Sequence, residues 1–413
     1  HICSGGTLAT LEALWVARGV QFAPLIAREF CRSERLDLRV RLPNGTEAPL
    51  IEVDNRTLLG LRPQESGSVL RALAYCLETE RQLTTEAALA AVNAGVARSP
   101  FNVARRGLGP ILATTGLRPV IFASAAAHYS IVKSCNVLGY GEDAVRFIPV
   151  NDRFQMNVTA LADGLGELAA NEYVAATIGI VGTTEEGAVD AIHRIRSLRD
   201  RSEREQNRSF WIHVDAAWGG YLRTLFNGVA VRPVPHDAGI EALCDEYIAA
   251  LDLHERLDLD LGAERPDIRT LEVRWNDRET YAAFLAMADA DSTTVDPHKM
   301  GYVPYPAGVV AFRDGGVTEF ITQRAQYLSD EPVGIGSFEG GAQVTAFGPH
   351  ILEGSKPGAA ALACWLAHSE TYLLASRSVV RAGLLESEGL GVTKRILGML
   401  KADLDARRIG LTL

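Results

Sequence analysis

Several features are scarce or missing in this sequence of 413 residues. Its six cysteines lie far apart, with no Cys-x-x-Cys pair and no histidine spacing typical of zinc ligands, so we expect reduced thiols and no metal site. The longest apolar runs, such as residues 359–367, reach only about half of the roughly 20 residues that a membrane-spanning helix needs. Lys and Arg form no dense cluster, and the net charge of −10 repels phosphate backbones and anionic lipids. The composition therefore disfavours nucleic-acid and membrane partners, and we expect a cytoplasmic protein.

The apolar segments that are present predict an α/β protein. Runs rich in β-branched residues, several of them apolar on both faces, alternate with amphipathic stretches, which is typical of a mostly parallel sheet covered by helices. The expected strands are residues 118–123, 145–150, 174–181, 210–214 and 308–312. The expected helices are residues 7–18, 129–138, 158–168, 191–201 and 357–368.

Two segments fit this alternation poorly. Residues 31–117 contain an Asn-Gly pair at 44–45 that predicts a hairpin, and helices are expected at 66–81 and 85–97. Residues 227–290 carry an Asp/Glu-rich stretch that we interpret as helical. We interpret both as excursions from the main layer and not as separate domains.

A lysine stands in the sequence Asp-Pro-His-Lys-Met-Gly at 296–301. A lysine links covalently to a carbonyl compound only if it is held near that partner and can lose its proton. A solvated lysine in a surface turn is the alternative for Lys299. The preceding Pro and His and the apolar strand that follows favour the functional interpretation.

Two further side chains follow expected strands. Asp215 ends the strand of the sequence Trp-Ile-His-Val-Asp-Ala-Ala at 211–217, and His128 comes shortly after the strand at 118–123. Ligands of open α/β sheets lie outside the carboxyl ends of strands, where both residues are expected. Asp215 as a helix or turn cap, and His128 as a structural residue, are the alternatives.

Small and hydroxyl residues form the remaining motifs. The sequence Ser-Gly-Gly-Thr at 4–7 precedes an amphipathic helix, so its backbone N–H groups and the helix end suit a phosphate monoester, unless it is an ordinary capping turn. The sequence Gly-Thr-Thr at 182–184 places two hydroxyls after another strand. Because the chain opens directly on a working motif, we also expect that an N-terminal segment is missing. Together, the five motifs supply the groups that pyridoxal phosphate needs: an amine, a carboxylate, a phosphate cradle, a ring-packing imidazole and hydroxyls.

In their order and form the motifs resemble those of the group II pyridoxal-phosphate-dependent amino acid decarboxylases. The Asp-Pro-His-Lys-Met-Gly sequence and the later Gly-Ser-Lys-Pro-Gly at 354–358 look most like the tyrosine/aspartate decarboxylase branch of archaea and bacteria. The resemblance runs from residue 4 to about residue 365. It implies the aspartate-aminotransferase-like fold type I, with a large cofactor-binding domain at 1–330, then a lid loop and a partial C-terminal small domain at 331–413. It also implies a homodimer with active sites at the subunit interface.

The resemblance assigns roles around the cofactor ring. Lys299 would carry pyridoxal 5'-phosphate as an internal aldimine, and Asp215 would pair with the pyridinium nitrogen. His128 would stack on one face of the ring, and Ala217 would pack on the other.

The same resemblance assigns the phosphate, the hydroxyls and the reaction. Thr183 or Thr184 would lie near the ring hydroxyl or the substrate carboxylate. The residues expected around the phosphate are Gly5, Gly6, Thr7, Thr294 and His298. The implied reaction converts an L-amino acid to its amine and CO2, with catalytic roles for Lys299, His128, Asp215 and His298. The proton that returns to the substrate would come from His298, from Lys299 or from a tyrosine of a mobile loop.

The sequence departs from the family in that loop. Residues 331–352 contain no tyrosine, although Tyr327 lies just upstream, and Lys356 stands where many relatives have arginine. The alternatives that remain are an aldehyde synthase, which couples decarboxylation to oxidative deamination, and a related carbon–carbon lyase. A third alternative is not an enzyme: the chain could be a catalytically silent assembly module. The sequence does not identify the substrate, and the motifs favour tyrosine or aspartate.

Overall fold

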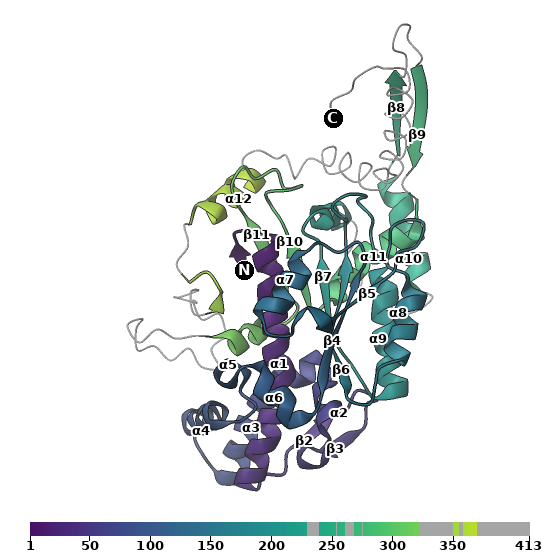
Figure 1. Ribbon diagram of the computed structural model, residues 1–413. Helices are drawn as coiled ribbons and strands as arrows, with labels where there is room; N and C mark the ends of the chain where they lie inside the picture. Colours follow the sequence, from purple (N-terminus) through teal and green to yellow (C-terminus); the bar gives the residue numbers. More distant parts are fainter. Residues whose placement is uncertain are drawn as a thin grey trace.

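The computed structural model describes residues 1–228, 239–252, 254–260, 268–274, 276–322, 350–354 and 358–369. Its centre is a seven-stranded sheet in the order β1-β11-β10-β7-β6-β4-β5 (Figure 1). The strands are β1 (Ile2–Cys3), β4 (Arg118–Ser124), β5 (Val145–Ile148), β6 (Glu172–Ile180), β7 (Trp211–Asp215), β10 (Ser292–Val295) and β11 (Gly308–Phe312). Neighbours from β5 to β10 pair in parallel, and β11 is antiparallel to both β10 and β1. The predicted α/β fold with a mostly parallel central sheet is confirmed.

Two strands of this sheet were not predicted: β1, which has only two residues, and β10, whose residues are Ser, Thr, Thr and Val. Ser292 and Thr294 are nevertheless buried, and the Ser292 hydroxyl accepts a hydrogen bond from Trp211 Nε1 at 2.8 Å. Polar side chains that find partners inside the sheet replace the apolar pattern here.

Helices cover both faces of the sheet (Figure 1). Along β4, Ile121 and Ala123 belong to the core on one face, whereas Val120 and Phe122 belong to the core on the other. The first face is covered by α1 (Gly6–Glu34) and α7 (Ser130–Val137). The second is covered by α8 (Val158–Gly166), α9 (Ile192–Gln206), α10 (Gly239–Leu251) and α11 (Arg278–Ala286). Burial on both faces explains why these strands lack a polar side.

Helix α1 is much longer than the predicted 7–18. Between Gly19 and Ala27 the only polar residue is Gln21, so the amphipathic pattern ends although the helix continues. The helix lies between the sheet and the segment 31–117, and its few polar groups are bonded there. Gln21 donates to the Leu59 and Val174 carbonyls at 2.9 and 3.0 Å, and Arg28 donates to the Val53 carbonyl at 2.7 Å.

The segment 31–117 packs onto α1 and shares its core. The predicted hairpin is confirmed: β2 (Arg39–Arg41) pairs with β3 (Glu47–Pro49) through a turn in which Gly45 has a φ of +89°. The helices that follow are α2 (Asn55–Leu59), α3 (Pro63–Arg81), α4 (Thr85–Arg98), α5 (Val103–Arg106) and α6 (Leu108–Thr115). The domain division near residue 330 stays a prediction.

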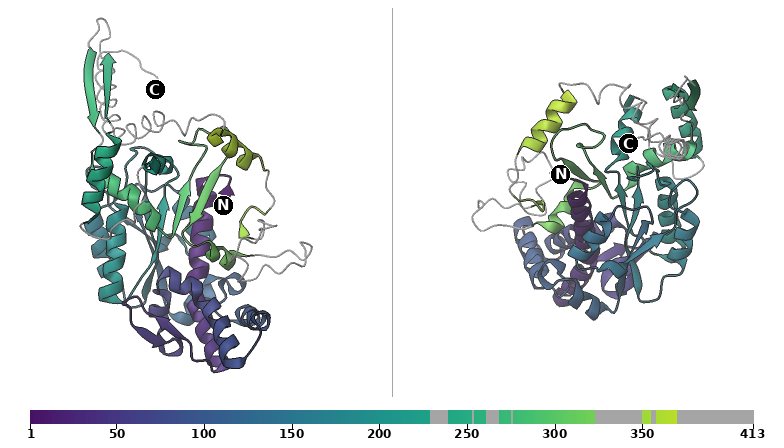
Figure 2. Two further views of the ribbon diagram at one scale, coloured as in Figure 1. Left: turned by 180° about the vertical axis from the view of Figure 1, so that it is seen from behind. Right: turned by 45° about the horizontal axis from the view of Figure 1, so that its top comes forward.

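The expectation of a helical stretch across 227–290 is wrong in its middle. Between α10 and α11, β8 (His254–Asp260) and β9 (Ile268–Arg274) form an antiparallel hairpin that projects from the body of the molecule (Figures 1 and 2). The segment Glu-Arg-Leu-Asp-Leu-Asp alternates charged and apolar residues with the period of a strand. The acidic composition of this segment suggested a helix, whereas the alternation of charged and apolar residues indicates a strand.

The remaining described elements are short. They are η1 (Leu50–Glu52), η2 (Glu142–Ala144), η3 (Gly219–Gly228), η4 (Met287–Asp289), η5 (Gly315–Ile321) and α12 (Ala359–Ser369). The predicted helix 357–368 corresponds to α12. Among the described residues, no helix has both the length and the apolar character needed to cross a bilayer.

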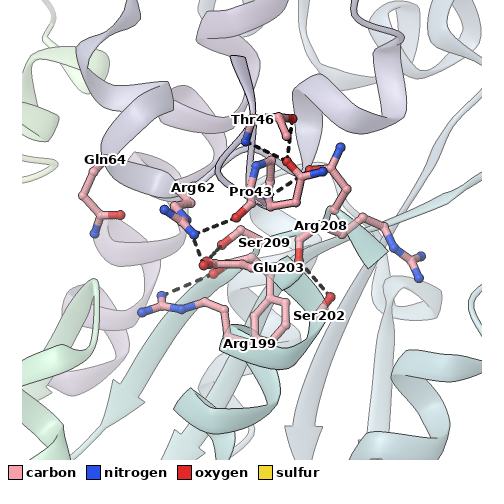
Figure 3. A network of polar contacts seen from close by, with 12 residues as sticks. Pro43, Thr46, Arg62, Gln64, Arg199, Ser202, Glu203, Arg208 and Ser209 are labelled. Atoms are coloured by element: carbon pink, nitrogen blue, oxygen red, sulfur yellow. Dashed lines mark hydrogen bonds and ion pairs between the residues drawn. The ribbon is translucent and has the colours of Figure 1, made fainter. Parts of the chain in front are cut away.

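A network of charged groups lies at the amino ends of β7 and β10 (Figure 3). Glu203 accepts hydrogen bonds from Arg62 Nε at 2.8 Å and from the Ser209 hydroxyl at 2.7 Å. Asp291 accepts from Arg199 Nη1 at 2.7 Å and from the Ile212 backbone N–H at 2.8 Å. The network ties α3 and α9 to the sheet.

Candidate functional site

A cavity of about 340 Å³ lies at the carboxyl ends of β4, β6 and β7, beside the start of α1 and the turn after β10. Every residue predicted for the site lines this cavity except Thr294. The lining residues are Ser4, Gly5, Gly6, Thr7, Leu8, Ala126, His128, Ser130, Ile180, Gly182, Thr183, Thr184, Asp215, Ala217, Trp218, Asp296, His298 and Lys299. The parallel strands thus bring together motifs that lie up to 295 residues apart, since the lining runs from residue 4 to residue 299.

The glycine turn at the start of α1 has no room for side chains. A Cβ at Gly6 would lie 2.8 Å from Asp296 Oδ2 and 3.0 Å from the Ala217 Cβ, and one at Gly5 would lie 3.2 Å from His298 Cε1. The turn therefore presents bare backbone to the cavity at the amino end of a helix, an arrangement that fits a phosphate group.

Lys299 lies in the tight turn that follows β10. Its backbone N–H donates to the Asp296 carbonyl at 3.0 Å, and its carbonyl accepts from Tyr302 N–H at 3.0 Å. The side chain is 39% exposed and places Nζ 3.0 Å from Asp296 Oδ2. The lysine is thus held at the cavity wall with its amine reachable from the cavity.

Asp296 is a cavity residue that sequence reasoning missed. It stands in the same motif as Lys299, but only the lysine and the histidine were singled out. The signal was an acidic residue three positions before the lysine, the spacing that one turn brings into contact.

Asp215 ends β7 with its side chain almost fully buried. Burial raises the pKa of the Asp215 carboxyl, and the Ala217 N–H, which donates to Oδ1 at 3.2 Å, lowers it, as does the charge of Lys299. A carboxylate in this wall fits a protonated ring nitrogen of the cofactor.

His128 presents a flat, neutral ring to the cavity. Its Nδ1 accepts a hydrogen bond from the Ser130 N–H at 3.2 Å, so the neutral ring carries its hydrogen on Nε2. Partial burial lowers the pKa of the imidazole, which favours this neutral form. The ring also packs on Tyr129, with centroids 3.9 Å apart.

The two threonines after β6 differ in what their hydroxyls do. Thr183 is buried, and its hydroxyl accepts from the Ala188 N–H at 3.0 Å and donates to Glu186 at 3.1 Å. Thr184 is exposed and lines the cavity. The Thr183 hydroxyl therefore stabilises the loop between Thr183 and Ala188, and the Thr184 hydroxyl can reach a ligand in the cavity.

Thr294, expected beside the phosphate, does not line the cavity. Its side chain is buried within the sheet, where the hydroxyl lies 3.4 Å from His213 Nε2. Thr294 pairs with Asp215 in the parallel register, so both side chains lie on the same face of the sheet, but the Thr294 hydroxyl lies towards His213, further from the carboxyl ends of the strands. The other nitrogen of His213 lies 2.8 Å from the Ser292 hydroxyl.

The segment 350–354 approaches the start of α1. Glu353 accepts hydrogen bonds from the Ser4 N–H, at 3.0 Å, and from the Ser4 hydroxyl. The Leu352 N–H donates to the buried carboxyl of Glu12 at 2.9 Å. Sequence reasoning did not anticipate these contacts. The expectations for Tyr327, for Lys356 and for a lid within 331–349 lie outside the described residues.

Comparison with known proteins identifies the family. Residues 82–242 match the family model of the pyridoxal-dependent decarboxylase conserved domain. The chain is 31% identical over 404 residues to an L-tyrosine decarboxylase of Levilactobacillus brevis, covering 97% of this chain and 53% of that protein. It is 30% identical over 369 residues to an L-tyrosine decarboxylase of Enterococcus faecium, covering 89% and 49%. The chain thus spans about half the length of these curated relatives.

Among solved structures, a sphingosine-1-phosphate lyase of Burkholderia pseudomallei is similar with a TM-score of 0.42 and 15% identity, covering 92% of this chain and 50% of that one. The sequence matches confirm the family inferred from the motifs, and pyridoxal phosphate is the cofactor of that family. Residues 82–242 thus belong to the pyridoxal-dependent decarboxylase family, and the chain as a whole is similar to curated L-tyrosine decarboxylases.

Proposed function

We propose that this chain forms the cofactor-binding part of an L-amino acid decarboxylase, which releases CO2 and the corresponding amine. The observation that supports this most is the meeting of Lys299, Asp215 and the glycine turn of α1 around one cavity. These groups come from three distant parts of the chain, and neither a buried carboxylate nor a lysine beside it is needed to fill an apolar core. A silent assembly module would have no use for them.

Each group has a proposed task. The backbone of Gly5, Gly6 and Thr7 binds the phosphate, and Asp215 keeps a negative charge at the ring nitrogen. The neutral His128 ring packs on one face of the cofactor, with Ala217 on the other. Bound pyridoxal phosphate supplies the electron sink for the electrons released when CO2 leaves. Lys299 carries the cofactor covalently and, when free, holds a proton beside the reacting carbon.

L-tyrosine is the proposed substrate. Both tyrosine decarboxylases above match most of this chain, and the motifs favour the tyrosine/aspartate branch. A homodimer with shared sites is proposed from the same relationship. Analytical ultracentrifugation of the full-length protein checks the dimer, and a single sedimenting monomer at micromolar concentration would contradict it.

The first experiment is a visible absorption spectrum of the full-length protein before and after borohydride. We expect a band that borohydride removes, with the cofactor then fixed to the peptide containing Lys299. The aldehyde synthase is an alternative because residues 331–352 lack a tyrosine. A panel of L-amino acids, assayed for CO2, amine and aldehyde, separates it from the decarboxylase by its product.

Two lysine variants give the control. Lys299→Ala should lose both the band and CO2 release. Lys133→Ala should keep them, because Lys133 is exposed and lies 4.3 Å over the Tyr129 ring without lining the cavity. A Lys299→Ala variant that retains the reducible band would overturn the assignment.

A further inference from the structure

One carboxylate of the cavity has no task in the proposed reaction. The Asp296 side chain is 2% exposed and lies in the cavity wall. Its backbone is fixed at both ends of the turn, since its N–H donates to the Ala217 carbonyl at 3.2 Å and its carbonyl accepts from Lys299 N–H at 3.0 Å. The backbone hydrogen bonds of this turn therefore fix the position of the Asp296 carboxylate.

The side-chain partners of Asp296 are unusual for a buried carboxylate. Oδ2 lies 3.0 Å from Lys299 Nζ and 3.6 Å from His298 Nε2, and both of these are cavity residues. Oδ1 has no hydrogen-bond partner among the described residues. A buried carboxylate with unused hydrogen-bonding capacity destabilises a fold. Its retention indicates a role toward a group that occupies the cavity.

Asp291 provides the contrast within the same chain. It is also buried, and it lies five positions earlier (296 − 291 = 5). Its two oxygens accept hydrogen bonds from Arg199, Gln64 and the Ile212 N–H. Both oxygens of Asp291 thus have partners, whereas Oδ1 of Asp296 has none among the described residues.

The chemistry of Lys299 supplies the role. To bond to the aldehyde of pyridoxal phosphate, the ammonium first loses one proton to solvent. The neutral amine then bonds to the aldehyde carbon, and the carbonyl oxygen leaves as water with both amine hydrogens, so no electrons are gained or lost. Asp296 Oδ2, which lies 3.0 Å from Nζ, holds the Lys299 amine at the part of the cavity wall where this bond would form.

We propose that Asp296 is a positioning residue for Lys299, which holds the Lys299 amine at the cavity wall and so sets the rate at which the amine attaches to the cofactor. This inference rests on the proposed function, because it requires that Lys299 carries pyridoxal phosphate. The other titratable groups facing this region are Asp215, His128, His298 and Tyr221.

The test measures attachment and not turnover. Full-length protein freed of cofactor is mixed with pyridoxal phosphate across the neutral to alkaline range, and samples are quenched with borohydride. The fixed cofactor on the Lys299 peptide is then counted by mass spectrometry. In Asp296→Asn the attachment rate should fall about tenfold across this range, because the carboxylate no longer holds Nζ in place. Asp296→Glu, which keeps the charge, should restore a profile close to that of the parent protein.

Asp291→Asn is the matched control, since it makes the same chemical change at a buried carboxylate outside the cavity. It should lower the unfolding midpoint without moving the attachment profile. Superimposable profiles for the parent protein and Asp296→Asn would refute the role of Asp296. Absence of attachment in the parent protein itself would instead refute the proposed function, so the two failures are distinguishable.

Discussion

The two ends of the sheet treat buried charge differently. At the amino ends of β7 and β10, Asp291 and Arg199 are paired. Glu203 accepts hydrogen bonds from both Arg62 and Ser209 (Figure 3). At the carboxyl ends, Asp215 and Asp296 are as deeply buried, yet Asp296 keeps an oxygen without a partner among the described residues. Saturated charges hold elements together, whereas unsaturated ones remain available to a ligand. In this comparison, Asp291 and Glu203 use their oxygens to join elements of the fold, whereas Asp296 keeps an oxygen available at the cavity.

The largest effect is expected at the functional end. Asp215→Ala should reduce decarboxylation by about 10³-fold, because the ring nitrogen loses the negative charge that stabilises its protonated form. The unfolding free energy should stay the same or rise, since burial raises the pKa of this carboxyl and its ionised form is unfavourable in the fold. Steady-state kinetics and urea unfolding of the same preparation check both. A normal rate in this variant would contradict the role given to Asp215.

At the structural end the opposite result is expected. Arg199→Ala leaves the Asp291 carboxylate buried without its charged partner, which should lower the unfolding free energy by about 3 kcal/mol. Turnover per folded molecule should change little, because neither residue lines the cavity. Urea unfolding and activity normalised to bound cofactor provide the measurements. If Arg199→Ala lost turnover but kept the unfolding free energy of the parent protein, the amino ends of β7 and β10 would not have a purely structural role.

His213 lies between the two ends, in the middle of β7, and tests the comparison through pH. Burial lowers its pKa from 6.5 to about 4, so in that range the unfolded chain binds the proton more readily. Stability should therefore decrease as pH falls from 6.5 towards 4, by about 2 kcal/mol at pH 5 for this residue. Urea unfolding at pH 7.5 and 5 should show a smaller decrease in His213→Gln.

The exposed His254 offers the control for this measurement. His254→Gln should keep the pH dependence of the parent protein. If the two variants behave alike, burial of His213 does not govern the decrease.

The smallest effect concerns the phosphate cradle. A Cβ at Gly6 would lie 2.8 Å from Asp296 Oδ2, so Gly6→Ala should weaken pyridoxal phosphate binding about tenfold, or about 1.4 kcal/mol. Gly109→Ala is the control, because a Cβ there meets no atom within 4 Å. Equilibrium dialysis gives both affinities, and an equal affinity for the two variants would mean that the cradle is not tight.

The sequence predicted most of the sheet, and all but one of the predicted site residues line the cavity, because both depend on local signals. Apolar runs mark strands buried on both faces, and parallel strands bring the residues that follow them to one edge. Burial was harder to predict. Strand β10 is polar in sequence but bonded inside the sheet, and Thr294 faces His213 instead of the cavity.

Other errors arose where partners lie far along the chain. The roles of Thr183 and Thr184 depend on whether Ala188 and Glu186 engage the hydroxyl, which composition does not reveal. Asp296 was overlooked because neither its burial nor the Oδ1 atom without a partner among the described residues can be seen in the sequence. The β8–β9 hairpin had a readable period, but its acidic residues led us to a helix.

Helix α1 has a consequence for ligand binding that follows from its length. Its first turn is the proposed phosphate cradle, and its later turns are fixed to distant segments by Gln21 and Arg28. The proposed phosphate cradle is thus the first turn of a helix whose position is already fixed in the folded chain. Little conformational entropy remains to be lost when an anion arrives, so the affinity of this site is set largely while the chain folds.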